Sequence, residues 1–125
     1  MARILLAVDE DSLRILVERA LRHDGHEVVS NSDGAAALDS LARDKGNFDL
    51  LLTDIRMPIM DGIALALTAS RDYPNLTILL MTGYADQRER AHGLNLLIHD
   101  VITKPFTLSA ICGAVKEALA VRQVH

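Results

Sequence analysis

The sequence predicts an α/β fold in which a doubly wound, five-stranded parallel sheet lies between two layers of helices. Five short apolar runs alternate with amphipathic segments along the chain. The runs consist mainly of Leu, Ile and Val, which is typical of strands buried on both faces. Strict alternation of strands and helices predicts right-handed crossovers, and these place helices on both faces of the sheet.

The composition is that of a small globular domain. The chain has 125 residues, of which 50% are hydrophobic and only 3% aromatic, so we expect an aliphatic core. A net charge of −4 argues against nucleic acid as the main partner, because phosphate binding needs clustered Lys and Arg. No apolar run reaches the roughly 18 residues of a membrane span, and no signal-peptide pattern is present. We therefore expect a cytoplasmic protein that binds neither nucleic acid nor membranes.

The first half of the chain is expected to hold three strands and two helices. The first helix ends at Asp24-Gly25, because glycine readily adopts the left-handed conformation that closes helices. Ser32 or Asp33 caps the second helix. The expected bounds are strands over 3–8, 27–30 and 49–53, with the first helix over 12–23.

The second half adds two strands and three helices. Tyr73-Pro74 ends one helix, because the residue before proline is pushed out of the helical region. Thr107 caps the last helix, in which Cys112, the only cysteine, is expected to fill the core. Residues 1–121 are expected to form one domain, and 122–125 a flexible tail. The other expected elements are helices over 62–72 and 86–95 and strands over 77–82 and 100–103.

Polar side chains stand at the ends of four expected strands. Asp9 follows the first, Asp54 the third, Thr82 ends the fourth and Lys104 follows the fifth. Because parallel strands end at one edge of a sheet, where open α/β sheets place ligands, these groups are expected to meet. Two acids, a hydroxyl and an ammonium suit a carboxylate that accepts a phosphoryl group. Each alone has an ordinary explanation as a cap or turn residue, but four such coincidences favour a site.

These residues lie in segments that resemble the response-regulator receiver domain, a CheY-like family. The resemblance covers nearly the whole chain. It implies a flavodoxin-like, three-layer fold with strand order 2-1-3-4-5. It also implies that a histidine kinase or histidine phosphotransferase transfers a phosphoryl group to Asp54. The matching segments are ILLAVD (4–9), DIRMPIMDG (54–62), MTGYA (81–85) and KPF (104–106).

The resemblance also implies roles for individual residues. Mg²⁺, which prefers oxygen ligands and keeps several waters, would be held by Asp9, Asp54 and the Arg56 carbonyl. Thr82 and Lys104 would contact the phosphoryl oxygens, because phosphoryl transfer depends on positioning and charge. Such a domain is not an enzyme in the usual sense, since it supports only its own phosphorylation and dephosphorylation.

One departure from the family pattern lies after the first strand. Receivers usually carry two adjacent acids there. Counting without gaps puts Val8 in the first place and Asp9 in the second, so that Glu10 comes one position late and points elsewhere. A gap that makes Asp9 and Glu10 the pair is the alternative. With Val8 in the acid's place, we expect weaker Mg²⁺ binding and slower phosphorylation, or an interaction module locked in one state.

A second departure lies on the fifth strand. Val101 stands where many receivers have an aromatic ring that turns inward on activation. The signal is therefore expected to travel through the loop after Thr82 and the following helix. Tyr84 is expected to control the access of water to the phosphoryl group. Lys104-Pro105 is a candidate cis peptide bond that would aim the ammonium inward.

Within the family, the chain resembles the CpdR-type stand-alone regulators, on segments such as ARILLA and MTGYADQRER. In that subgroup the unphosphorylated form is an adaptor for the ClpXP protease in cell-cycle phosphorelays. The resemblance implies a partner surface on the fourth helix, fifth strand and fifth helix, with Arg88, Arg90 and His92 as its polar part. A generic single-domain receiver is the alternative.

Two other classes fit less well. A phosphatase of the haloacid-dehalogenase type needs a second acid two residues after the nucleophile, where this chain has Arg56. A flavodoxin-like electron carrier needs a phosphate-binding loop rich in Ser, Thr and Gly after the first strand. The acidic segment Asp9-Glu10-Asp11 has the wrong charge for that loop.

Overall fold

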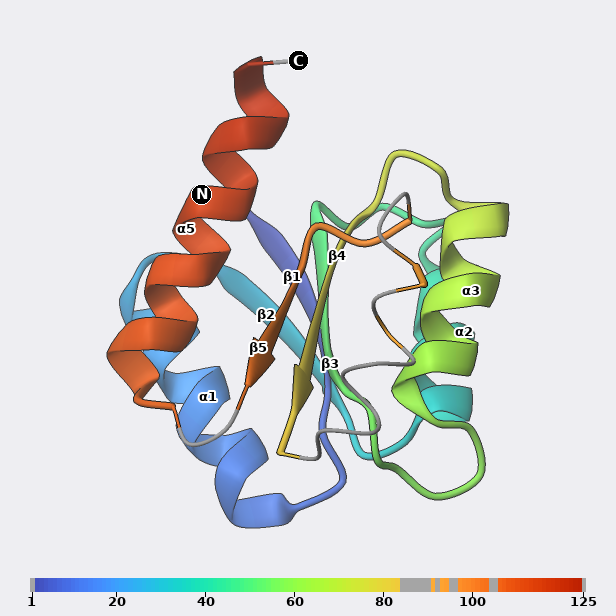
Figure 1. Ribbon diagram of the computed structural model, residues 1–125, viewed down its shortest axis with the longest axis horizontal. Coiled ribbons are helices and arrows are strands. Elements are labelled where there is room, and N and C mark those ends of the chain that lie inside the picture. The colour runs from blue at the N-terminus through green and yellow to red at the C-terminus, as the bar shows by residue number, and fades with distance from the viewer. Residues whose placement is uncertain (1, 84–90, 92, 95–96, 104–105, 125) are drawn as a thin grey trace.

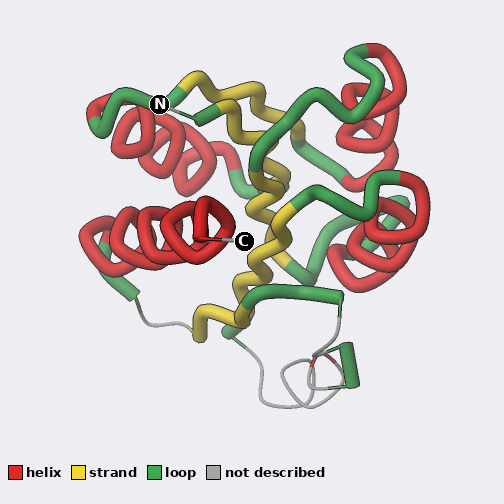
Figure 2. Tube along the Cα trace, turned by 90° about the horizontal axis from the view of Figure 1, so that it is seen from above, coloured by secondary structure: helices red, strands yellow, loops and turns green. Residues whose placement is uncertain are grey.

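A five-stranded parallel sheet forms the centre of the computed structural model, which describes residues 2–83, 91, 93–94, 97–103 and 106–124 (Figure 1). The strand order is β2-β1-β3-β4-β5, which confirms the predicted fold class and order. Helices α1 and α5 cover one face of the sheet, and α2 and α3 cover the other (Figure 1, Figure 2). The strands are β1 (Arg3–Ala7), β2 (Glu27–Asn31), β3 (Leu50–Asp54), β4 (Thr77–Thr82) and β5 (Asp100–Thr103).

Short polar side chains set the beginnings of two helices. The Asp33 carboxylate accepts a hydrogen bond from the backbone N–H of Ala36 at 2.7 Å, so Asp33 rather than Ser32 caps α2. The Asp61 carboxylate accepts from the N–H of Ala64 at 2.8 Å in the same way at the start of α3. The helices are α1 (Asp11–His23), α2 (Gly34–Arg43), α3 (Gly62–Asp72) and α5 (Leu108–Val124).

The last helix begins where the sequence predicts. Thr107 precedes it, and its hydroxyl oxygen accepts a hydrogen bond from the N–H of Ala110 at 3.0 Å. The helix runs to Val124, and no Gly or Pro interrupts residues 114–124. The flexible tail over 122–125 stays a prediction. The predicted helix over 86–95 lies largely outside the described residues. None of the described helices is long and apolar enough to cross a membrane.

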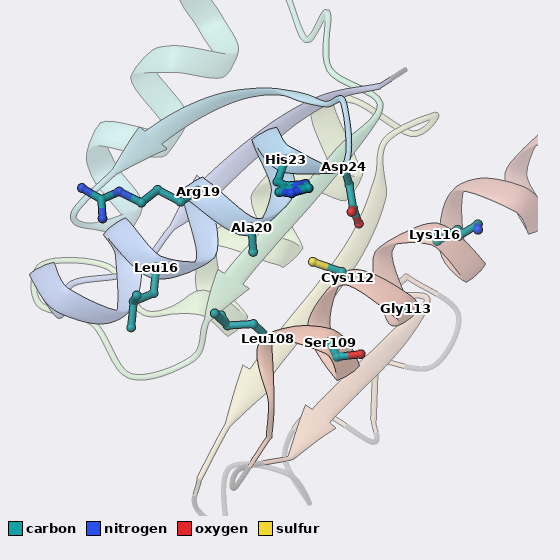
Figure 3. A pocket seen from close by; sticks show the side chains of 10 residues that line it. All are labelled: Leu16, Arg19, Ala20, His23, Asp24, Leu108, Ser109, Cys112, Gly113 and Lys116. Atoms are coloured by element: carbon teal, nitrogen blue, oxygen red, sulfur yellow. The ribbon is translucent and has the colours of Figure 1, made fainter.

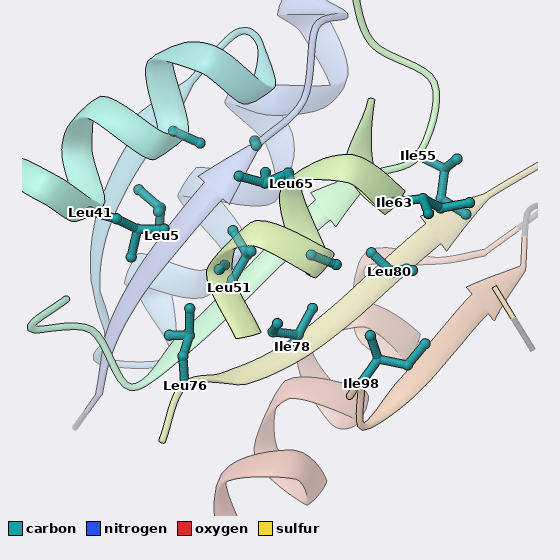
Figure 4. Close-up of a cluster of buried hydrophobic side chains, with 14 of the residues drawn as sticks. Leu5, Leu41, Leu51, Ile55, Ile63, Leu65, Leu76, Ile78, Leu80 and Ile98 are labelled. Atoms are coloured by element: carbon teal, nitrogen blue, oxygen red, sulfur yellow. The ribbon is translucent and has the colours of Figure 1, made fainter. Parts of the chain in front are cut away.

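Two apolar clusters fill the spaces between the sheet and the helices. They are separate because successive residues of a strand point to opposite faces. Leu51 belongs to the cluster under α2 and α3 (the α2–α3 cluster, Figure 4), whereas Leu50 and Leu52 belong to the cluster under α1 and α5 (the α1–α5 cluster). Both clusters are almost wholly aliphatic, as the composition predicts. Each fully buried side chain of this kind contributes about 1.5–3 kcal/mol to folding.

Candidate functional site

The carboxyl ends of the parallel strands meet at one edge of the sheet (Figure 1). Asp54 is the last residue of β3, which extends one residue further than predicted, and it pairs with Met81 of β4. Thr82 ends β4 and pairs with Thr103 of β5. Asp54 is only 6% exposed and Thr82 is fully buried. The structure therefore brings these two predicted site residues to neighbouring strand ends.

Val8 lies beside Asp54 at this edge. The register pairs Ala7 with Thr53, so the next position on each strand brings Val8 next to Asp54. Neighbouring strands lie about 4.8 Å apart, and side chains at equivalent positions share a face. Val8 is fully buried in the α1–α5 cluster, to which Leu52, two residues before Asp54, also belongs. An apolar side chain thus stands next to the buried carboxylate.

Asp9 and Glu10 lie outside the buried part of this edge. Both are exposed, and Glu10 is the residue that precedes α1. The Glu10 carboxylate accepts a hydrogen bond from the Ser12 hydroxyl at 3.2 Å, and its carbonyl accepts from the Arg14 N–H at 2.9 Å. Glu10 therefore belongs to the start of the helix. That Val8 and Asp9 occupy the two acid positions of the family stays a prediction.

Arg14 is a residue of this edge that the sequence analysis did not single out. Its guanidinium donates a hydrogen bond to the carbonyl of Val8 at 2.9 Å and pairs with the Asp11 carboxylate at 2.6 Å. These contacts join the first turn of α1 to the end of β1. The sequence does carry a signal for this contact, because Arg14 stands about one turn into a helix that directly follows the end of a strand. The contact adds a positive charge beside a carbonyl adjoining the candidate site.

The loop between β3 and α3 contains a tight, strained turn. The N–H of Met60 donates to the carbonyl of Pro58 at 2.7 Å, and Ile59 between them has φ of 70°. This is the arrangement of a γ-turn of the rare, strained kind. Ile59 is also 83% exposed, so no packing of its side chain explains the conformation. Strain of this kind often occurs close to functional sites.

Gly62 closes the same loop against Asp54. A Cβ atom at Gly62 would lie 2.1 Å from the carbonyl oxygen of Asp54, so only glycine fits. The N–H of Gly62 donates to the carbonyl of Ile55 at 2.7 Å, and the Thr53 hydroxyl donates to the Asp54 carbonyl at 2.9 Å. The backbone of Asp54 is therefore held from two sides. Such contacts fix the backbone from which its side chain projects at the sheet edge.

Comparison with known proteins identifies the family. The model of the response regulator receiver domain matches residues 4–116. The chain belongs to the response-regulator receiver family. It is 37% identical to the response regulator receiver protein CpdR of Brucella abortus, over 95% of this chain and 98% of that protein, which confirms the predicted CpdR-type resemblance. Other relatives are longer regulators, of which the chain spans about a quarter.

Solved structures of receivers agree with the fold. The response regulator TrrA of Thermotoga maritima, in complex with Mg²⁺ and BeF, has a TM-score of 0.82 at 28% identity, covering 94% of this chain and 99% of that one. The receiver domain of the hybrid histidine kinase CckA has a TM-score of 0.79 at 30% identity, covering 94% of this chain and 98% of that one. This receiver therefore shares the CheY-like arrangement of its family.

Several predicted positions of this receiver lie outside the described residues, namely Tyr84, Lys104 and Pro105 at the site and Arg88, Arg90 and His92 on the fourth helix. Val101 is described. It pairs with Leu80 of β4 and packs, partly buried, against the α2–α3 cluster. The side chain at the place of the switch aromatic is thus a small aliphatic one that already contacts the core.

The donor set of this receiver suits Mg²⁺ in kind. The carboxylates of Asp9 and Asp54 and the carbonyl of Arg56 are oxygen donors, and Mg²⁺ accepts few protein oxygens while keeping several waters. Within the described ranges, no group of three or more His, Cys, Asp and Glu side chains is arranged to hold a metal ion. A carboxylate at position 8 would adjoin Asp54, because the register of β1 and β3 puts these two positions side by side.

Proposed function

We propose that this chain is a single-domain response regulator of a two-component phosphorelay in the cytoplasm. It accepts a phosphoryl group on Asp54 from a histidine kinase or histidine phosphotransferase and changes its partner binding as a result. The observation that carries the proposal is a buried carboxylate at the end of β3, beside a buried threonine at the end of β4. Membership of the receiver family and the likeness to a CckA receiver domain support it.

The chemistry is a transfer between two nucleophiles. A carboxylate oxygen of Asp54 attacks phosphorus and forms an acyl phosphate, while the bond from phosphorus to the donor's imidazole nitrogen breaks and the nitrogen keeps the electron pair. Thr82 and Lys104 hold the phosphoryl oxygens in this proposal, and the Arg56 carbonyl and the Asp9 carboxylate would join Asp54 in holding Mg²⁺. The cation would neutralise charge on the transferring group. The chain catalyses no turnover of another substrate.

The downstream role we propose is that of a protease adaptor in cell-cycle control. The support is the likeness to CpdR over nearly the full length of both chains. The partner in this proposal is the ClpXP protease, which would bind the face formed by the fourth helix, β5 and α5. Because Val101 cannot act as an aromatic switch, displacement of the loop after Thr82 carries the signal in this proposal, and Tyr84 controls the access of water to the phosphoryl group.

A second candidate function rests on Val8. Its buried, apolar side chain beside Asp54 favours an interaction module that binds its partner without being phosphorylated. Moving a two-state switch from mostly off to mostly on requires roughly 5.5 kcal/mol of differential stabilisation. A site with weak Mg²⁺ binding supplies less of this energy. In that case the fold is kept in one state.

One experiment separates the two functions. The protein is incubated with Mg²⁺ and acetyl phosphate, and its intact mass is measured beside that of Asp54→Asn. A response regulator gains one phosphoryl group that the variant does not gain. No adduct in the parent, with an adduct in Val8→Glu, would establish the locked module. No adduct in the parent or in Val8→Glu, at any Mg²⁺ concentration, would contradict phosphorylation at Asp54 altogether.

A further inference from the structure

A groove of about 650 Å³ runs along the surface between α1 and α5 (Figure 3). Its apolar lining comes from Leu16 and Ala20 on α1 and from Leu108 and Cys112 on α5. Leu16 and Leu108 are 49% and 36% exposed, although both are large and apolar. The groove therefore leaves apolar surface of both helices in contact with solvent.

Gly113 opens the groove further. It lies inside α5, where glycine costs about 0.5–1 kcal/mol relative to alanine. A Cβ atom at Gly113 would meet no described heavy atom within 4 Å, in contrast to Gly34 and Gly62, where backbone oxygens lie at 2.5 and 2.1 Å. No contact in the described part of the chain requires this glycine. A small residue at such a position lets a second backbone approach the helix closely.

The rim of the groove is positively charged on a protein whose net charge is −4. Arg19 and Lys116 line it, and neither forms an ion pair with any residue that the structure describes. His23 adds a third basic group. The lining has one acid, Asp24, whose carboxylate helps to raise the pKa of the neighbouring Cys112 thiol, after the larger effect of burial. The local charge thus favours an acidic occupant.

We propose that this groove binds an amphipathic helix of a partner protein that carries acidic side chains beside small and apolar ones. The apolar face would cover Leu16 and Leu108 and approach α5 closely at Gly113, since helices pack at interaxial distances of about 8–10 Å. The acidic side chains would reach Arg19 and Lys116. The proposal does not depend on phosphorylation of Asp54.

A second copy of this chain is a poorer occupant. In a symmetric dimer the same patch occupies both sides of the interface. Both sides of such an interface would carry the cations Arg19 and Lys116, and like charges across an interface oppose binding. The groove also extends to His23 and Asp24, at the end of α1 that lies away from the carboxyl edge of the sheet.

The proposal is tested with two synthetic peptides that differ only in charge. Each forms an amphipathic helix with Leu and Ala on one face, flanked by Glu in the first peptide and by Lys in the second. Titration into the ¹⁵N-labelled protein is followed by amide chemical shifts. The Glu peptide is expected to shift amides of α1 and α5 that line the groove, and the Lys peptide to bind at least about tenfold more weakly.

Variants locate the binding. Gly113→Leu fills the groove and should weaken the Glu peptide about tenfold or more, whereas Ala110→Leu, on the same helix but outside the lining, should leave its affinity unchanged. Leucine is a better helix former than glycine and enters open space, so Gly113→Leu should remain folded, and thermal unfolding verifies this. Arg19→Glu combined with Lys116→Glu should reverse the preference between the peptides.

Four results would overturn the proposal. Equal affinity for the two peptides would remove the electrostatic argument, and equal affinity of parent and Gly113→Leu would place binding elsewhere. Concentration-dependent dimerisation that Gly113→Leu abolishes would assign the groove to a second copy. Absence of any shift with the Glu peptide would also refute it.

Discussion

Replacing Val8 by glutamate tests how the position beside Asp54 controls cation binding. Val8 is fully buried among the apolar side chains of the α1–α5 cluster. Val8→Glu places a second carboxylate about 5 Å along the sheet from Asp54, at the spacing of neighbouring strands. We expect lower stability without Mg²⁺ and tighter binding of Mg²⁺.

The two effects have comparable sizes. Loss of the buried valine costs about 1.5–3 kcal/mol of unfolding free energy, and repulsion between the two carboxylates adds to this cost. A group that orders a metal-bound water changes metal affinity about 10–100-fold. Mg²⁺ at about 100 times its dissociation constant stabilises the folded state by about 2.7 kcal/mol. Saturating Mg²⁺ should therefore restore most of the stability that Val8→Glu loses.

Urea unfolding in EDTA and in increasing Mg²⁺ measures the stability, and calorimetric titration measures the affinity. Val8→Gln is the matched control, because its side chain has nearly the same shape without the charge. Val8→Glu should also react faster with acetyl phosphate. An unchanged Mg²⁺ affinity in Val8→Glu, or an equal gain in Val8→Gln, would show that a missing charge at this position does not limit the site.

Three further predictions concern other parts of the molecule. Ile59→Gly should stabilise the protein by up to about 1 kcal/mol in urea unfolding, because relief of the left-handed conformation (~1–2 kcal/mol) exceeds the entropy cost of glycine. Ile59→Ala keeps the Cβ atom and should gain less stability. A loss of stability in Ile59→Gly would contradict the strain. Gly62→Ala should lower the unfolding free energy by about 1–3 kcal/mol or more, because the new methyl group meets the Asp54 carbonyl. The same variant should be phosphorylated more slowly by acetyl phosphate. Stability and rate equal to those of the parent would refute this prediction. Burial, and to a smaller extent the Asp24 carboxylate, raise the pKa of the Cys112 thiol, so the thiolate fraction at pH 8 is low. Asp24→Asn should therefore speed the alkylation of Cys112 by iodoacetamide. An unchanged alkylation rate would remove Asp24 as a cause.

Local features of the sequence determined the elements and the location of the site. Some features act only through neighbouring residues, so periodicity and turn chemistry predict them. They are the apolar runs, the caps Asp33 and Thr107, and the glycine at position 25, which adopts φ of 92°. Once the strands are parallel, their carboxyl ends share an edge. The meeting of Asp54 and Thr82 therefore follows from the order of the chain alone.

Only the tertiary structure decided which side chain stands beside Asp54. That neighbour depends on the hydrogen-bond register between β1 and β3, which are far apart in sequence, and a shift of one residue would turn Val8 to the other face. Likewise, Cys112 packs, partly buried, against the α1–α5 cluster, as its helical spacing predicts, but only the packing of α1 against α5 decided that it also lines the open groove. Pairings and helix contacts across the fold are long-range, and the one-dimensional pattern of apolar residues does not specify them.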